Sequence, residues 1–225
     1  RGALVIGSSI AMLGALVAVY STTMAIGLTT ASVLTVPIAD GYGAVGVPAK
    51  DGAKRHSGAV VTFKVSGGRL KPLAMITQDS AKVPGKSETN DRFGSAVAVI
   101  RACKGGEGLL VGTSREAIET AADAGSVWVL PLAKACKQRT QLYEGHGVVG
   151  GAPTEMGLMG AAVSALRTTA SGPDTLVFTA PGITEEGVYG RVFTQAAPYS
   201  GNAVLVVKDL ILNEEGIIAL SPPAG

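Results

Sequence analysis

The chain has few of the side chains on which most enzymes and metal proteins depend. Its 225 residues include two cysteines and two histidines, and aromatic residues make up 4% of the total. A four-cysteine zinc site is excluded, and a mixed site would need all four of these side chains to converge. A Ser-His-Asp or Cys-His group would have to use His56 or His146. We therefore expect a protein that is not an enzyme.

Charged residues are also scarce. They make up 16% of the chain, whereas typical soluble domains have about 25%. The net charge is +2 at pH 7, which implies no general field that attracts polyanions, and we expect no nucleic-acid partner. The apolar fraction of 47% is enough to build a core and excludes a disordered chain.

The chain does contain an internal repeat with a period of about 66 residues. Four kinds of short apolar segment recur, each bounded by Gly, Pro, Asp or Ser, which is typical of β-strands. The copies lie at Gly27, Gly94 and Gly160 for the first kind, at Gly46, Gly112 and Ala180 for the second, at Gly58, Gly125 and Gly190 for the third, and at Ile76 and Tyr143 for the fourth.

Four short strands per unit describe a small antiparallel sheet, which cannot bury both of its faces alone. Radial stacking of such sheets, as in a β-propeller, solves this problem. We therefore predict an all-β protein, a β-propeller built of four-stranded blades. A β-sandwich with coincidental glycine spacing is the alternative.

The predicted organisation is a single propeller-like domain over residues 1–225. Clear repeats cover 26–92, 93–158 and 159–195, with degenerate units at 1–25 and 196–225. At this period the chain holds about 3.4 blades, whereas propellers have about 4–8. Three explanations for this shortfall in blades are open. The chain is a processed piece of a longer protein, some of its loops are missing from the sequence, or partner chains complete the ring.

The middle unit carries the most specific motifs. Asp91–Val97 reads DRFGSAV, Leu109–Gly112 reads LLVG, and Ala124–Val129 reads AGSVWV. This pattern resembles the FG-GAP repeat, which builds the propellers of integrin α-chains and of many secreted bacterial proteins. The segment from Ile76 to Gly94 is similar to the linker in secreted actinobacterial members. The resemblance covers roughly residues 26–195, but only Gly94 follows a Phe.

The resemblance also raises calcium binding, because many members carry an Asp-rich loop between the first two strands of a blade. The corresponding loops, Arg101–Gly108 and Arg167–Asp174, do not offer three carboxylates each, and the loop of the first unit offers only Asp40. Calcium prefers several oxygen ligands, usually carboxylates. No cofactor and no metal ligand are therefore predicted.

Residues 2–39 contain no charged residue and no histidine. The segment 2–27 is long enough to span a bilayer, and a secretory signal segment is a second alternative. Serine and threonine interrupt the run, and Gly27 falls on the repeat. Buried strands are therefore the preferred interpretation, and a membrane span at 2–27 is less favoured.

Cys103 and Cys136 are predicted to form a disulfide. Cys103 lies in the hairpin after the Gly94 strand, and Cys136 follows the Trp128 strand of the same unit. Neighbouring hairpin ends in one small sheet can approach within disulfide range, and an even cysteine count favours a bridge in a secreted protein. Two free thiols, or a metal or catalytic role, are the alternatives.

Two further features have both an ordinary and a functional interpretation. The segment Gly145–Gly150 reads GHGVVG, but no amphipathic helix follows it, so we interpret it as a loop between blades and not as a nucleotide site. Trp128 and Tyr143 are expected to pack between blades, with a sugar-stacking platform at a rim as the alternative.

The predicted function is that of an extracellular or cell-surface binding module that recognises a protein or glycan through loops at one rim. The loops of interest are the linkers Gln78–Arg92 and Gly145–Met156. The candidate ligand-binding residues are Asp79, Lys82, Lys86, Glu88, His146 and Glu155. The alternatives are a structural subunit of a larger surface filament or multi-chain assembly, and an accessory domain of a secreted enzyme.

Overall fold

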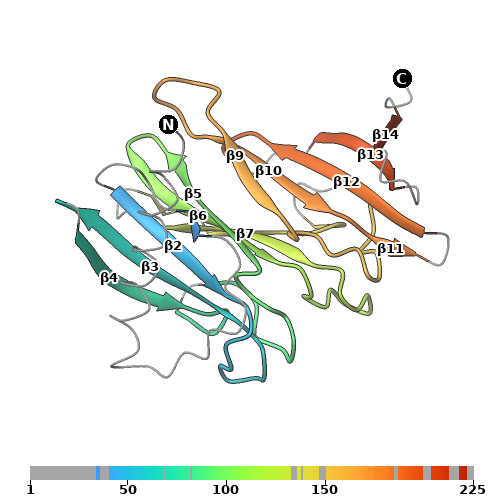
Figure 1. Ribbon diagram of the computed structural model, residues 1–225, viewed down its shortest axis with the longest axis horizontal. Coiled ribbons are helices and arrows are strands. Elements are labelled where there is room, and N and C mark those ends of the chain that lie inside the picture. The colour runs from blue at the N-terminus through green and yellow to red at the C-terminus, as the bar shows by residue number, and fades with distance from the viewer. Residues whose placement is uncertain are drawn as a thin grey trace, which may run out of the picture.

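The chain folds into three small antiparallel sheets that follow one another in sequence (Figure 1). A computed structural model describes residues 34–35, 41–67, 69–81, 83–132, 136–137, 139–146, 151–184, 187–199, 204–212 and 218–221. These residues form strands, turns and loops, and no helix occurs among them. The predicted all-β class is therefore confirmed, and the strands form three separate antiparallel sheets.

Each sheet is a meander in which strands that follow each other in the chain lie side by side. The first sheet contains β1 (Leu34–Thr35), β2 (Gly41–Val47), β3 (Ala59–Ser66) and β4 (Arg69–Ile76), in that order. The second contains β5 (Ala96–Cys103), β6 (Gly106–Thr113), β7 (Ser126–Pro131) and β8 (Thr140–Leu142), also in order.

The third sheet runs in the order β9, β10, β12, β13, β14. Its strands are β9 (Val163–Leu166), β10 (Thr175–Ala180), β12 (Gly187–Gln195), β13 (Val204–Leu212) and β14 (Ile218–Ser221), and β11 (Ile183–Thr184) pairs with the start of β12. Residues 204–212 and 218–221 therefore extend this sheet beyond β12.

The second sheet is covered on both faces. Strands β6 and β7 are buried along almost their whole length, whereas β10 alternates between buried and half-buried residues. Continuous burial requires an apolar neighbour on each side of the sheet. One core cluster lies between the first and second sheets and includes Ala44, Val60, Val111 and Trp128. Another lies between the second and third sheets and includes Leu110, Leu142, Phe178 and Tyr199.

Trp128 is the largest side chain of the first of these cores. It is fully buried and meets Phe93 edge to face, with 6.0 Å between the ring centroids. Its indole N–H donates to Thr113 Oγ1 at 2.9 Å, so the polar end of the ring is satisfied inside the core. The predicted packing role is confirmed, and this ring is not a sugar-stacking platform.

The connections between strands lie at two ends of the sheets. We call the first the loop end. It holds the β2–β3 and β6–β7 loops and the described residues of the two linkers between sheets, 77–81, 83–95, 143–146 and 151–162. We call the other the hairpin end, and it holds the β3–β4, β5–β6 and β9–β10 hairpins and the β7–β8 connection. Figure 1 shows the β5–β6 and β9–β10 hairpins at the upper left and the β2–β3 loop at the bottom.

The sequence repeat is also a repeat of hydrogen bonds. The N–H of Phe93 donates to the Ser57 carbonyl at 2.9 Å, and one unit later the N–H of Met159 donates to the Ala124 carbonyl at the same distance. The two parallel bridges Gly58–Phe93 and Gly125–Met159 repeat in the same way. Each linker is therefore attached to the loop of the sheet that precedes it by one recurring pattern.

The predicted disulfide is formed. Cys103 at the end of β5 is bonded to Cys136 in the β7–β8 connection, with the two Cα atoms 5.7 Å apart. The bridge therefore joins the end of the first strand of the second sheet to the connection between its third and fourth strands, at the hairpin end. Cys103 and Cys136 border the core between the second and third sheets.

Several predictions concern residues outside those described. They are the segment 2–27 with Gly27, the candidate ligand-binding residue Lys82, and residues 147–150 of the GHGVVG segment. Within the described part of the chain, no helix is long and apolar enough to cross a membrane.

Candidate functional site

The loop end concentrates the unusual backbone conformations of the molecule. Among the described non-glycine residues, eight have positive φ angles, and seven of these lie at the loop end. The seven are His56, Asn90, Arg92, Glu119, Asp123, Met156 and Leu158. Such angles are uncommon for side chains with a Cβ atom, and residues held in them cluster at functional sites.

Hydrogen bonds between loops hold these conformations in place. The N–H of Arg92 donates to the His56 carbonyl at 3.2 Å, and the N–H of Leu158 donates to the Asp123 carbonyl at 3.0 Å. In each linker, a residue with a positive φ angle thus donates a hydrogen bond to a residue with a positive φ angle in a loop of the preceding sheet. The result is a continuous frame of loops across the three sheets.

The first linker folds around Asp79. Its carboxylate accepts hydrogen bonds from the Ser87 hydroxyl at 2.6 Å and from the Ser87 N–H at 3.2 Å. At the start of the linker, the N–H of Thr77 donates to the Ser80 hydroxyl oxygen at 2.9 Å. Asp79 therefore shapes the linker itself, in addition to the ligand contact predicted for it.

A cluster of buried polar side chains lies under this linker. The Gln78 amide donates to Glu116 Oε2 at 2.6 Å, and the Gln141 amide donates to Glu116 Oε1 at 3.5 Å. Glu116 comes from the β6–β7 loop and Gln141 from β8, so the linker is bonded to two other elements of the second sheet. The side-chain oxygen of Gln78 is buried and has no hydrogen-bond partner among the described residues.

Burial changes the acidity of the two carboxyl groups in this cluster. Burial, and then the charge of Asp91, raises the pKa of Glu116 from 4.5 to about 8. Burial also raises the pKa of Asp91 from 3.8 to about 6, against the opposing effect of the Glu88 N–H, which donates to it. At neutral pH Glu116 is therefore protonated, which removes its negative charge from beside that of Asp91.

The predicted ligand-binding residues of the first linker differ in their environment. Lys86 and Glu88 are exposed, and Lys86 uses only its backbone carbonyl, as an acceptor for the Gln78 amide at 3.4 Å. Their charged groups therefore face solvent, while the buried Gln78 side chain bonds the linker to Glu116 of the β6–β7 loop. This is the arrangement that a contact surface requires.

The second linker offers His146 and Glu155, which are both exposed. The His146 ring stacks on Tyr143, with the centroids 4.6 Å apart and the planes at 14°. This linker and the first lie at the same end, with the β6–β7 loop between them. The structure thus gathers the described candidate residues at one end, in two groups.

Sequence reasoning did not single out an ion pair beside the second linker. Glu144 is buried and pairs with Arg191 of β12, whose second terminal nitrogen lies 3.3 Å from Glu144 Oε2. These two residues are 47 positions apart, so no local pattern marks them. In the sequence Glu144 is marked only by its place at the end of the short segment Gln141–Glu144.

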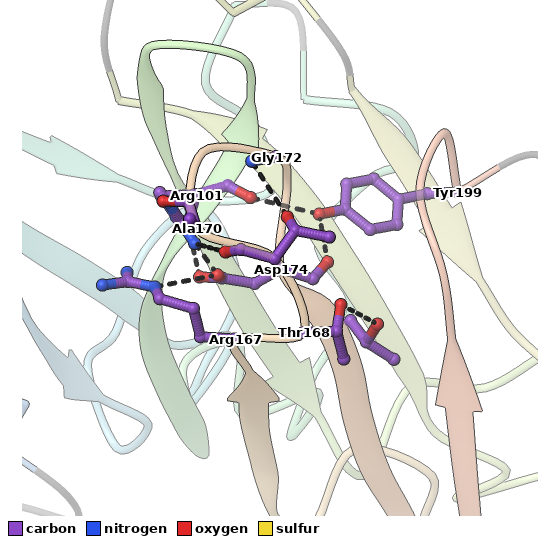
Figure 2. A network of polar contacts seen from close by, with 9 residues as sticks. Arg101, Arg167, Thr168, Ala170, Gly172, Asp174 and Tyr199 are labelled. Atoms are coloured by element: carbon purple, nitrogen blue, oxygen red, sulfur yellow. Dashed lines mark hydrogen bonds and ion pairs between the residues drawn. The ribbon is translucent and has the colours of Figure 1, made fainter.

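The hairpin end holds a second polar network, which Figure 2 shows from close by. The Arg101 guanidinium donates to the carbonyl oxygens of Thr169 and Ala170, at 2.7 and 2.6 Å. Its Nε atom lies 3.3 Å from the buried carboxylate of Asp174, and the Arg101 N–H donates to the same carboxylate at 2.8 Å. Arg101 therefore ties the second sheet to the β9–β10 hairpin.

Two more side chains complete this network. The Nε atom of Arg167 lies 3.4 Å from Asp174 Oδ1, and the Tyr199 hydroxyl donates to the Asp174 carbonyl at 2.8 Å. Burial, and then the charge of Asp174, raises the pKa of Tyr199 to about 12. The one carboxylate of this hairpin, Asp174, is therefore already paired with two guanidinium groups.

Among the residues that the structure describes, no three His, Cys, Asp or Glu side chains meet in a group that could hold a metal ion. No protein-family model matches the chain, and no curated protein sequence matches it. What the loop end can do chemically therefore follows from its geometry, which presents exposed charged side chains on a fixed frame.

Proposed function

We propose that this chain is a non-enzymatic binding module of the FG-GAP type, secreted or held at the cell surface, that recognises a protein or glycan through its loop end. The observation that carries the proposal is the frame of strained and hydrogen-bonded loops on which Lys86, Glu88, His146 and Glu155 are exposed. Fixed loops lose little conformational entropy when a ligand binds, and this favours affinity.

The stacking of the sheets supports a propeller. The second sheet is apolar on both faces, and the first sheet also has a second apolar face, formed by Val45, Val47, Val61, Phe63 and Val65. A series of sheets with two apolar faces each is what a radial stack requires. A β-sandwich would need only one apolar face per sheet.

The disulfide supports an extracytoplasmic setting. Disulfides persist mainly in oxidising compartments, and they are rare in reducing ones. The bond between Cys103 and Cys136 is in keeping with a secreted or surface-exposed module.

The proposal is tested with a triple variant at the loop end, Lys86→Ala, Glu88→Ala and Glu155→Ala. The single variant Glu107→Ala at the hairpin end is the matched control, because it changes the net charge of the chain by the same amount and in the same direction. Both are compared with the unaltered chain on an array of defined glycans and purified extracellular proteins. We expect at least one probe to bind the unaltered chain and the control, and to lose roughly tenfold or more in affinity for the loop-end variant.

Absence of any binding on the array would contradict the proposal. So would a ligand that binds the loop-end variant as well as it binds the unaltered chain. Thermal unfolding of each variant shows whether a loss of binding is simply a loss of fold.

One other function is favoured by the number of sheets, that of a subunit in a larger assembly. The described residues form three sheets, whereas a closed propeller needs about 4–8 blades, so blades from several chains would complete the stack. Sedimentation of the purified chain tests this alternative. A discrete oligomer supports it, and a monodisperse species of 22.6 kDa overturns it.

A further inference from the structure

The fold sorts the charges of the chain between its two ends. The described cations at the hairpin end are Lys64, Arg69, Lys71, Arg101, Lys104, Lys137, Arg139 and Arg167, and the described carboxylates there are Glu107 and Asp174. Lys208 and Asp209 lie within β13, and the other described charges lie at the loop end, which has seven Lys and Arg residues and nine Asp and Glu residues. A net charge of +2 for the whole chain therefore conceals a strongly basic end.

The two ends also differ in how their charges are paired. At the loop end, Arg115 pairs with Asp123, and Arg191 pairs with Glu144. At the hairpin end, Arg101 and Arg167 share Asp174. None of the other six hairpin-end cations forms an ion pair with a described carboxylate. They are Lys64, Arg69, Lys71, Lys104, Lys137 and Arg139, and all six are exposed.

Two of these cations lie directly opposite each other on neighbouring strands. Lys64 of β3 and Lys71 of β4 are direct partners in the ladder, and Arg69 lies opposite Ser66, two positions further along the same face. Lys64 also lies over the Tyr42 ring, with its Nζ atom 5.9 Å from the centroid. Like charges directly opposite in a sheet destabilise it. A bound anion would remove that repulsion.

We propose that the hairpin end binds an anionic polysaccharide, a linear chain that bears sulfate or carboxylate groups. The unpaired cations come from the β3–β4 hairpin, the β5–β6 hairpin and the β7–β8 connection, so they extend over two neighbouring sheets. Cations that are spread over two sheets suit a long polyanion better than a single small anion. Attraction of this kind depends on the local field and not on the net charge of the protein.

The composition of the hairpin end favours a polysaccharide over other polyanions. Its tips consist of small and polar residues, and Leu166, which is 54% exposed, is the only large apolar side chain exposed there among the described residues. Insertion into a bilayer needs several such side chains. Single-stranded nucleic acids need aromatic platforms for base stacking, and of the described aromatic residues only Tyr42 lies beside these cations.

The experiment compares two triple variants that remove the same charge. The hairpin-end variant carries Lys64→Gln, Lys71→Gln and Lys104→Gln. The loop-end control carries Lys54→Gln, Arg55→Gln and Arg92→Gln. All six side chains are exposed, so both variants should fold, which thermal unfolding verifies. The probes are heparin, which is sulfated, polyglucuronate, which bears carboxylates only, and neutral dextran.

We expect the unaltered chain to bind heparin or polyglucuronate and not dextran, with an affinity that falls as salt is added. The hairpin-end variant should bind roughly tenfold more weakly or worse, and the loop-end control should bind as the unaltered chain does. The proposal is overturned if neither polyanion binds, or if both variants lose affinity equally, because the effect would then reflect net charge alone.

Vesicles of phosphatidylcholine with phosphatidylserine test whether the anions come from a membrane surface and not from a polysaccharide. Binding to these vesicles that equals or exceeds binding to the polysaccharides, and that the hairpin-end variant loses, would assign the surface to a membrane and overturn the polysaccharide proposal. The loop-end proposal is independent of this test, because it concerns other residues at the opposite end of the sheets.

Discussion

Gly112 lies so close to Gly160 that a Cβ atom on Gly112 would stand 2.0 Å from the Gly160 carbonyl oxygen. Gly46 and Gly94 have the same relationship one unit earlier, also at 2.0 Å. In each pair, a glycine of the second strand of one sheet contacts the glycine that begins the next unit. The backbones of neighbouring sheets therefore touch at a point that has no room for a side chain.

We predict that Gly112→Ala destabilises the protein strongly. The obstacle is a backbone carbonyl, which cannot rotate away as a side chain would, so the two sheets must separate or the strand must shift. The expected loss in the free energy of unfolding is about 3 kcal/mol, at the upper end of the usual cost of overpacking. Chemical denaturation monitored by the fluorescence of the single tryptophan, Trp128, measures it.

Gly105→Ala is the matched control for this prediction. Gly105 lies in the β5–β6 hairpin with a φ of +74°, and a Cβ atom there would meet nothing within 4 Å. Its substitution should cost only the backbone strain of about 1 kcal/mol. Equal losses for the two variants would show that contact between the sheets is not the cause.

A second prediction concerns the pairing of Arg101 and Asp174. Asp174→Asn removes the charge of a buried carboxylate that accepts from the Arg101 side chain and backbone, and leaves a half-buried guanidinium without a counter-ion. Breaking a buried pair in this way costs about 3 kcal/mol or more. The measurement is the urea midpoint of the variant against that of the unaltered chain.

Arg167→Gln tests whether this effect belongs to the buried pair. Arg167 also contacts Asp174 but its side chain is 64% exposed, so its removal should cost roughly 0.5 kcal/mol. If Arg167→Gln proved as damaging as Asp174→Asn, the stabilising partner of Asp174 would be misassigned.

The strands could be predicted from the sequence because they depend on local patterns. A run of short apolar segments between glycines specifies a strand wherever it occurs, and the spacing of Gly94 and Gly160 repeats in the folded chain as contacts with Gly46 and Gly112. The bond between Cys103 and Cys136 was predictable for a similar reason, because both cysteines belong to one repeat unit.

The polar networks could not be predicted in this way. Arg101 and Asp174 are 73 positions apart, and Gln78 and Glu116 are 38 apart. Which side chains meet at such separations depends on how the sheets stack, and no short-range pattern encodes that. The basic hairpin end could not be predicted for a similar reason. The net charge is a sum over the whole chain, and only the folded structure shows which charged residues lie at which end of the sheets.

The disulfide gives a third prediction. Replacing both cysteines, Cys103→Ala with Cys136→Ala, should lower the free energy of unfolding by about 3–4 kcal/mol, because the bond closes a loop with a sequence separation of 33 residues. Thermal unfolding with and without reductant measures this. Reductant should lower the midpoint of the unaltered chain and leave that of the double variant unchanged, and a midpoint that reductant does not move would contradict the prediction.

The last prediction concerns pH and Glu116. The folded chain holds the Glu116 proton with a pKa of about 8, whereas the ordinary value is 4.5. Between these two values the folded state binds more protons than the unfolded state, so the free energy of unfolding falls as the pH rises from about 4.5 to about 8. Asp91 adds to this fall between pH 3.8 and about 6. The protein should therefore be more stable at pH 5 than at pH 8.

Glu116→Gln isolates the contribution of this carboxyl group. Glutamine has the shape of the protonated acid and keeps an oxygen that accepts from the Gln78 amide, but it cannot lose a proton. The variant should be more stable than the unaltered chain at pH 8, by about 1–3 kcal/mol, and its stability should change less between pH 5 and pH 8. Glu119→Gln, at an exposed position of the same loop, should leave the pH profile unchanged. If Glu116→Gln has the same pH profile as the unaltered chain, the titrating group lies elsewhere in the protein.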